Sequence, residues 1–173
     1  MNMKDIDFFH VYADASFGDK ALKRKSVTGF VVMFAGAAVA YKSVVQRCIS
    51  VSTLQAEIVA CSEACREAEW IRMLLEEMGF KFSNPTPVYC DNEGVVKTVK
   101  NPANHNGCKH IEVRHLYARE LNELNKINIQ YVSTVDMVAD IFTKNLSESQ
   151  FCYLRDKLGL KELPSEFQHK LNY

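Results

Sequence analysis

Two short apolar runs in this sequence each lead directly to an aspartate, and they constrain the fold more than any other feature. Residues 8–13 are aromatic, aliphatic or histidine and precede Asp14, while Val88-Tyr89-Cys90 precede Asp91. Such runs are typical of buried strands. A carboxylate beside a buried strand is costly unless a metal ion or hydrogen bonds compensate it. Because strand ends carry the functional groups in α/β folds, we expect both acids at one edge of a sheet.

The rest of the chain alternates between strand and helix patterns. A first strand is predicted at residues 8–15, with a break after it at Gly18-Asp19-Lys20. Further strands are predicted at residues 27–34, 37–45, 88–90 and 127–132. The first three should form an antiparallel meander. Helices are predicted at residues 52–79, 94–100, 111–124, 133–144 and 148–158. Ser52 and Gln55 have the spacing of a capping box, and Trp70 is expected in the core.

Composition limits the domain count and the kind of partner. The 173 residues suit one compact domain, and 21 basic against 21 acidic residues leave a net charge of zero. Nucleic-acid binding would therefore need a local basic patch, for which Arg24, Lys97, Lys100 and Lys109 are candidates beside the alternative of ordinary solvated charges. The six cysteines, the lack of a signal peptide and the lack of a bilayer-length apolar run favour a soluble protein in a reducing compartment.

Asp14 and Asp91 are two of four acids that suit a two-metal site, the others being Glu57 in the long helix and an acid near residue 140. Hard divalent ions prefer oxygen ligands, and a shared carboxylate commonly holds such ions as a pair. A single acid in a neutral protein is more often merely solvated. Asp136 and Asp140 lie one turn apart in the predicted helix, so the pattern leaves the fourth ligand open.

Several motifs follow one another along the chain and together resemble those of a known family. The first are Tyr12-Ala13-Asp14-Ala15, Arg24-Lys25-Ser26-Val27-Thr28-Gly29-Phe30 and Ser50-Val51-Ser52-Thr53-Leu54-Gln55-Ala56-Glu57. The later ones are Tyr89-Cys90-Asp91-Asn92, Asn101-Pro102, Lys109-His110-Ile111-Glu112, Ala118-Arg119-Glu120, Ala139-Asp140-Ile141-Phe142-Thr143-Lys144 and Leu154-Arg155-Asp156-Lys157-Leu158-Gly159-Leu160. In order and spacing they resemble the ribonuclease H domain of copia-like (LTR) retrotransposon Pol polyproteins, over residues 10–160.

The resemblance implies a fold, an activity and a role for each acid. The fold is ribonuclease H-like, an α/β domain with a mixed five-stranded sheet and helices on both faces, formed by residues 1–160 and followed by a C-terminal tail, 161–173. The activity is cleavage of the RNA strand of an RNA/DNA hybrid by two Mg²⁺ or Mn²⁺ ions. Asp14 would bridge the two ions. Glu57 and Asp91 would complete the coordination of the ion nearer the leaving group, and Asp140, which the motif selects, would bind the ion that activates water. Asn92 is a candidate contact to an RNA 2′-hydroxyl.

The resemblance also implies a setting. The partners would be the hybrid and the reverse transcriptase and integrase parts of the same polyprotein. The location would be cytoplasmic, inside a virus-like particle if the element is active, or nuclear. No membrane partner is expected. Zinc is not expected either, although His105, Cys108 and His110, or Cys61 and Cys65, can be drawn as a site.

Two other functions fit parts of the same pattern. A domain that kept the fold and lost catalysis, as a decayed element or a protein adopted by its host, would bind nucleic acid or a partner without cutting. Ser16, where the family usually has Asp, and the neutral net charge favour it. An integrase or transposase would use the same fold with its Glu after the last Asp. Here Glu57 follows the first Asp, which argues against that alternative.

Overall fold

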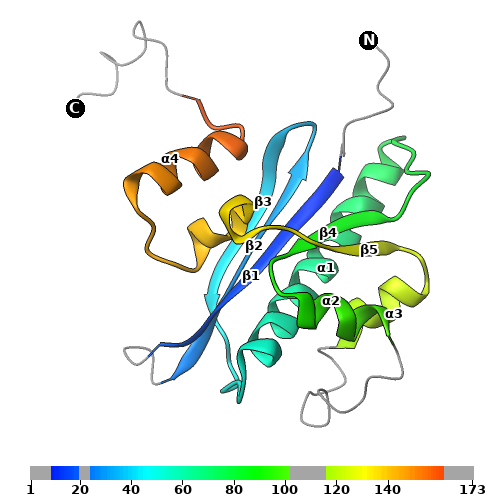
Figure 1. Ribbon diagram of the computed structural model, residues 1–173. Helices are drawn as coiled ribbons and strands as arrows, with labels where there is room; N and C mark the ends of the chain where they lie inside the picture. The colour runs from blue at the N-terminus through cyan, green and yellow to red at the C-terminus, as the bar shows by residue number, and fades with distance from the viewer. Residues whose placement is uncertain (1–8, 20–23, 102–115, 162–173) are drawn as a thin grey trace, which may run out of the picture.

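The structure is a computed structural model that describes residues 9–19, 24–101 and 116–161 (Figure 1). Its strands are β1 (Phe9–Asp19), β2 (Lys25–Phe34), β3 (Ala37–Val45), β4 (Thr86–Cys90) and β5 (Ile127–Tyr131). Its helices are α1 (Thr53–Glu77), α2 (Glu93–Lys100), α3 (Tyr117–Glu123) and α4 (Glu148–Lys157), with the 3₁₀ turns η2 (Thr134–Asp136) and η3 (Val138–Phe142). The predicted alternation of strands and helices is confirmed.

Within the described residues, the strands form one mixed sheet in the order β3-β2-β1-β4-β5. The pairs β1–β2 and β2–β3 are antiparallel, as predicted for the opening meander. The pairs β1–β4 and β4–β5 are parallel. Parallel neighbours need a crossover connection, and the chain between β3 and β4 supplies one in the form of α1. β1 therefore lies at the centre of the sheet, which places Asp14 in the middle of the molecule.

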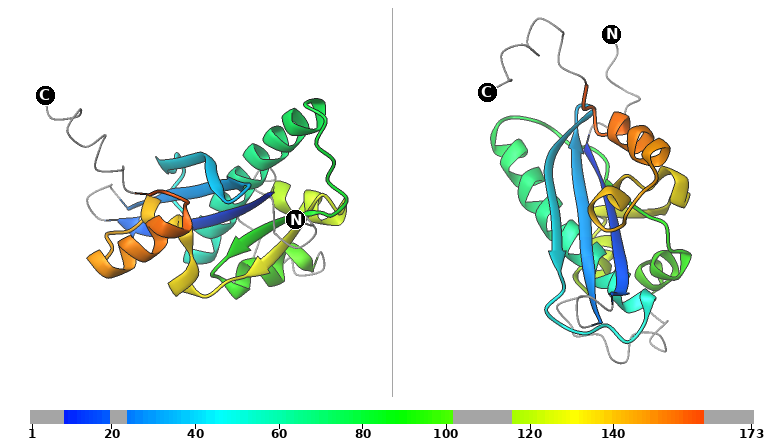
Figure 2. Two further views of the ribbon diagram at one scale, coloured as in Figure 1. Left: turned by 90° about the horizontal axis from the view of Figure 1, so that it is seen from above. Right: turned by 90° about the vertical axis from the view of Figure 1, so that its left-hand side faces the viewer.

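Helices cover both faces of this sheet, as predicted. α1, α2 and α3 lie on one face, and η3 and α4 on the other (Figures 1 and 2). The first layer buries a large apolar cluster that includes Val11, Ile58 and Val88. The second layer buries a smaller cluster in which Met33 of β2 packs with Leu154 of α4. Because side chains alternate along a strand, β2 contributes to both clusters.

The long helix α1 begins and ends where the sequence predicts. The Ser52 hydroxyl accepts a hydrogen bond from the Gln55 N–H at 3.1 Å, and the Gln55 side chain accepts one from the Val51 N–H at 2.8 Å. These bonds satisfy donors that a helix start otherwise leaves unpaired. Gly79 follows the helix with a φ of 95°, the left-handed conformation common after a helix end. Among the described helices, none is long and apolar enough to cross a membrane.

The helix predicted over residues 133–144 is wrong. The chain there forms η2 and η3, separated by Met137 with an extended backbone (φ −73°, ψ 94°). Met137, Val138, Ala139 and Asp140 are all buried. A regular helix has one core-facing stripe and cannot bury so many consecutive positions at the edge of a domain, whereas short turns can.

Two smaller expectations are also wrong. β1 includes Gly18 and Asp19, where a break was predicted, because Gly18 adopts a φ of 61° within a register irregularity and lets the strand reach Asp19. Lys20, the last residue of the predicted break, lies outside the described residues. Trp70 is 60% exposed rather than in the core, because the stripe of α1 that faces the sheet contains Ala68 and Ile71 and leaves Trp70 on the opposite side.

Some predicted features lie outside the described residues. These are the ends of the predicted domain and its tail, residues 1–8 and 162–173, and the segment 102–115, which contains Lys109 and the first part of the helix predicted at 111–124.

Candidate metal centre

Asp14 lies on the central strand β1, two residues past the last residue of β1 that pairs with β4, and is completely buried. It pairs with Gly29 of β2 in the antiparallel ladder, and Ala13 and Ala15 beside it are also buried. The Thr143 hydroxyl donates a hydrogen bond to Asp14 Oδ2. The Lys144 ammonium donates one to Oδ1 at 3.2 Å. The cost of a carboxylate in the centre of a sheet is thus offset by a hydrogen bond and a cation that reach it from the segment containing η3.

Glu57 reaches the same region from the N-terminal part of α1. Its Oε2 accepts a hydrogen bond from the Ala15 N–H at 3.1 Å, so it lies next to the residue that follows Asp14. The capping bonds at Ser52 fix where the helix starts and therefore which face presents Glu57 to the sheet. Glu57 is buried because α1 contacts β1 at this position.

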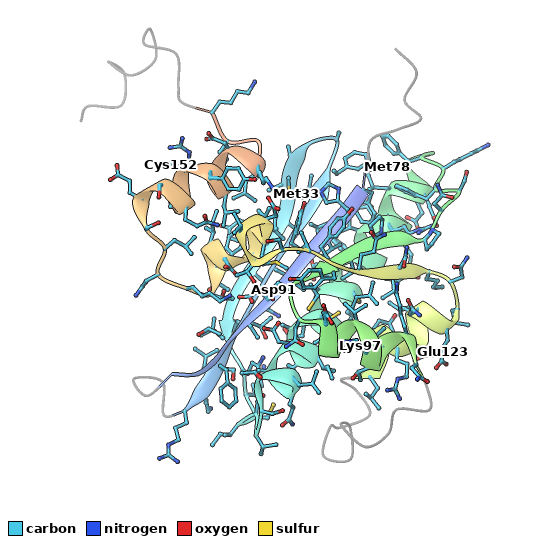
Figure 3. The ribbon with its side chains drawn as sticks, in the orientation of Figure 1. Met33, Met78, Asp91, Lys97, Glu123 and Cys152 are labelled. Atoms are coloured by element: carbon cyan, nitrogen blue, oxygen red, sulfur yellow. The ribbon has the colours of Figure 1, made fainter. Side chains whose placement is uncertain are left out.

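Asp91 and Asp140 complete the set, the first from the end of β4 and the second from η3. Asp91 directly follows β4, lies near the centre of the view in Figure 3, and accepts a hydrogen bond from the Thr134 hydroxyl at 2.9 Å. Asp140 is buried within η3 and accepts a hydrogen bond from Lys144 at 2.7 Å. Asp136 lies elsewhere, since its carboxylate accepts hydrogen bonds from Tyr153 and Lys157 of α4. The structure therefore places Asp140 at the cluster, in line with the motif.

The four predicted acids meet in two overlapping groups. Among the described residues, ligand atoms of Asp14, Asp91 and Asp140 lie within 4.8 Å of one another, and so do those of Glu57, Cys90 and Asp91. Asp91 is common to both groups. The resemblance gives the shared position to Asp14, and which carboxylate bridges two ions stays a prediction. The set of oxygen donors fits one or more hard divalent ions.

Burial and neighbouring charges raise the pKa of Glu57 and of Asp140. Burial, followed by the charges of Asp14 and Asp91, raises the pKa of Glu57 to about 9. Burial is also the largest cause for Asp140, whose pKa rises to about 6 although the hydrogen bond from Lys144 opposes the rise. Burial alone would lower the pKa of Lys144, but the Asp14 charge and the hydrogen bond to Asp140 raise it. The cluster therefore favours bound cations, whether protons, an ammonium or metal ions.

Known proteins resemble this chain in sequence and in fold. It is 32% identical over 149 residues, 86% of its length, to the retrovirus-related Pol polyprotein from transposon TNT 1-94 of Nicotiana tabacum. It is 30% identical over 155 residues, 90% of its length, to the corresponding polyprotein from transposon RE1 of Arabidopsis thaliana. No protein-family profile matches it.

Solved structures give the fold. The N-terminal RNase H domain of a Mycobacterium tuberculosis protein superposes with a TM-score of 0.56 at 14% identity, over 86% of this chain and 96% of that one. RNase H1 from Halobacterium salinarum superposes with a TM-score of 0.53 at 20% identity, over 78% and 93% of the two chains. The chain is a homologue of one segment of retrovirus-related Pol polyproteins, and it has the ribonuclease H-like fold. It spans 11% of the length of those polyproteins.

Two side chains that contact Asp14 were not predicted as part of the site from the sequence. Thr143 and Lys144 belong to the quoted motif, but no role was expected for them, and the structure joins both to Asp14. The spacing of Asp140 and Lys144, four residues apart with opposite charge, was the available signal. Together with Ser16 and Ser43 they border a groove of about 540 Å³ beside the acids.

The described residues among the predicted nucleic-acid contacts have local partners or lie exposed at the surface. The Asn92 side chain caps α2 by accepting a hydrogen bond from the Gly94 N–H at 2.9 Å. Lys97 forms an exposed ion pair with Glu93, and Lys100 is exposed at the end of α2. Arg24 is exposed in the turn before β2 with a φ of 64°. Binding roles for these residues, and for Lys109 outside the described residues, stay predictions.

Three of the five cysteines that the structure describes are core residues. Cys61, Cys65 and Cys90 are buried in the large apolar cluster. Burial raises the pKa of the Cys90 thiol, and a hydrogen bond with Cys65, followed by burial, raises that of Cys61. The drawn site at His105, Cys108 and His110 lies outside the described residues.

Proposed function

We propose that the chain is a metal-dependent ribonuclease H that cuts the RNA strand of RNA/DNA hybrids during retrotransposon reverse transcription. The observation that carries this proposal is the meeting of four acids in two groups that share Asp91. They are Asp14 of β1, Glu57 of α1, Asp91 directly after β4 and Asp140 of η3. The homology to Pol polyproteins and the ribonuclease H-like fold support it.

The cluster suits two Mg²⁺ or Mn²⁺ ions held by these four acids. When bound, such ions lower the pKa of a coordinated water and stabilise negative charge on a phosphodiester. The chain's own task is to hold the carboxylates in place. The Ala15 N–H orients Glu57, the Thr143 hydroxyl orients Asp14, and the Thr134 hydroxyl orients Asp91. Hydrogen bonds of this kind keep ligands in a productive geometry.

RNA selectivity is assigned to Asn92. Its Oδ1 caps α2, which leaves the side-chain amide as a donor group adjacent to Asp91. A donor there suits a 2′-hydroxyl, which tells RNA from DNA at a given position. The reverse transcriptase and integrase parts of a Pol polyprotein are the proposed neighbours in the full-length protein, since this chain corresponds to only one segment of its relatives.

A second candidate is a domain that binds nucleic acid or a partner without cutting it. Ser16 borders the groove beside the acids at a position where the family usually has Asp. A missing carboxylate lowers the local negative charge that attracts metal ions. All four proposed ligands remain acidic, so we place cleavage first.

One assay separates the candidates. A labelled RNA/DNA hybrid is incubated with the chain and Mg²⁺ or Mn²⁺, and RNA fragments are measured for the wild type, Asp14→Asn and Asp136→Asn. We expect cleavage by the wild type, none by Asp14→Asn with its circular dichroism spectrum unchanged, and near-normal cleavage by Asp136→Asn, because Asp136 pairs with α4 away from the cluster. Hybrid binding without cleavage by the wild type would favour the non-catalytic candidate.

A further inference from the structure

The Lys144 ammonium is shared by two of the buried acids. It lies 3.2 Å from Asp14 Oδ1 and 2.7 Å from Asp140 Oδ1. Its backbone is held in place, since its N–H donates to the Asp140 carbonyl at 3.0 Å and the neighbouring Thr143 N–H donates to the same carbonyl at 3.1 Å. A cation thus stands between two carboxylates that we propose as ligands of one metal ion.

This arrangement differs from the other lysine–carboxylate pairs near it in the fold. The side chains of Asp14 and Asp140 are 0% and 5% exposed, while Lys144 itself is 35% exposed. The pair Lys157–Asp136 is 34% and 40% exposed. Exposed pairs contribute little, whereas removing the partner of a buried charge is costly. Lys144 therefore stabilises the ionised carboxylates of Asp14 and Asp140.

The other two acids have neutral partners. Glu57 accepts its hydrogen bond from the Ala15 N–H, and Asp91 accepts one from the Thr134 hydroxyl. Neither donor carries a charge that would repel an incoming divalent ion. The cluster is thus electrostatically uneven, with the positive charge of Lys144 in contact with Asp14 and Asp140 and not with Glu57 or Asp91.

We propose that Lys144 is an internal counter-cation that competes with a divalent ion for Asp14 and Asp140 and thereby makes the two ions bind in order. This inference rests on the proposed two-metal function. A first ion would be held by Glu57 and Asp91, which do not contact the ammonium in this structure. A second ion at Asp14 and Asp140, and with it the Asp14 bridge between the ions, would require displacement of the ammonium. Displacement needs no unfolding, because Lys144 borders the groove that contains Ser16, Ser43 and Asn145 and can turn into it.

The test is calorimetric titration of the full chain with Mn²⁺ alone, for the wild type and Lys144→Gln. We expect two binding steps in the wild type, a tighter one and a weaker one. In Lys144→Gln the affinity of the weaker step should rise by about tenfold, the scale expected for loss of one partly exposed competing charge. Lys144→Arg keeps the charge and should behave like the wild type. Lys157→Gln, which removes a lysine from the exposed Asp136 pair, is the matched control and should also be unchanged.

Thermal unfolding supplies a second readout. In EDTA, Lys144→Gln should melt below the wild type, because Asp14 and Asp140 lose their cation, and saturating Mn²⁺ should remove the difference. Lys144→Met, which keeps the apolar stem, gives the same test if the Gln variant does not fold. Unchanged Mn²⁺ affinities in both charge-removing variants would overturn the role of Lys144 while leaving the metal centre intact. No Mn²⁺ binding by any variant or the wild type would overturn this inference and the two-metal function together.

Discussion

At the scale of single residues, the centre is an arrangement of buried charge whose members depend on one another. Burial and the charges of Asp14 and Asp91 raise the pKa of Glu57 to about 9, while the charge of Lys144 acts to lower it. A carboxylic acid whose pKa is higher in the folded than in the unfolded state binds a proton preferentially when folded. The acid that we expect to hold a metal is therefore one that gains a proton when no metal competes for it.

This gives the stability of the domain a definite pH dependence. Between the ordinary value of 4.5 and about 9, the folded chain retains a proton on Glu57 that the unfolded chain has lost, so stability should fall as pH rises. The slope is at most about 1.4 kcal/mol per pH unit for this group. Urea denaturation in EDTA at several pH values measures it. Glu57→Gln should flatten the decline above pH 6, and an unchanged slope in that variant would assign the effect to another group.

At the scale of elements, the position of Asp140 depends on how closely η3 approaches the sheet. The approach is possible because β2 has a glycine at position 29, opposite Asp14. A Cβ at Gly29 would lie 2.4 Å from Thr143 Cγ2, 3.0 Å from Phe142 Cβ and 3.2 Å from the Ala139 carbonyl oxygen. The missing side chain thus allows Thr143 to reach Asp14.

Gly29→Ala should therefore push η3 away from the sheet. We expect a loss of about 1–3 kcal/mol in the free energy of unfolding, typical of overpacking a close contact, and weaker Mn²⁺ binding at Asp14 and Asp140. Chemical denaturation and metal titration of the folded variant check the two effects separately. Gly36→Ala is the control for loss of a glycine, since a Cβ there has no atom within 4 Å, although its φ of 82° carries its own strain. Full metal affinity in Gly29→Ala would show that η3 can shift without moving Asp140.

At the scale of the whole molecule, the neutral net charge matters more than any single basic side chain. Twenty-one basic and 21 acidic residues create no general attraction to nucleic acid. Among the candidate basic residues that the structure describes, Lys97 is already paired with Glu93. The chain matches one segment, 11% of the length, of Pol polyproteins.

The isolated domain should therefore bind RNA/DNA hybrid weakly, and less well as salt rises. Fusion to a module that binds duplex nucleic acid should raise cleavage at subsaturating hybrid by about a hundredfold, because the tether supplies an effective concentration. Cleavage rates of the free and fused chains across a salt series, with Asp14→Asn as the blank, measure this effect. Equal rates for the two forms would refute a need for tethering.

The sequence by itself determined most elements and singled out Asp14 and Asp91 through local signals, while the family resemblance supplied the fold class and the choice of Asp140 as the fourth predicted ligand. Apolar runs ending in Asp14 and Asp91, and the capping pattern at Ser52, are written in neighbouring residues. The tertiary structure decided what depends on approach between distant segments. It replaced a predicted helix by η2 and η3, turned Asp136 toward α4 and Asp140 toward Asp14, and placed Lys144 between two acids, because burial and charge pairing there are set by the sheet beneath.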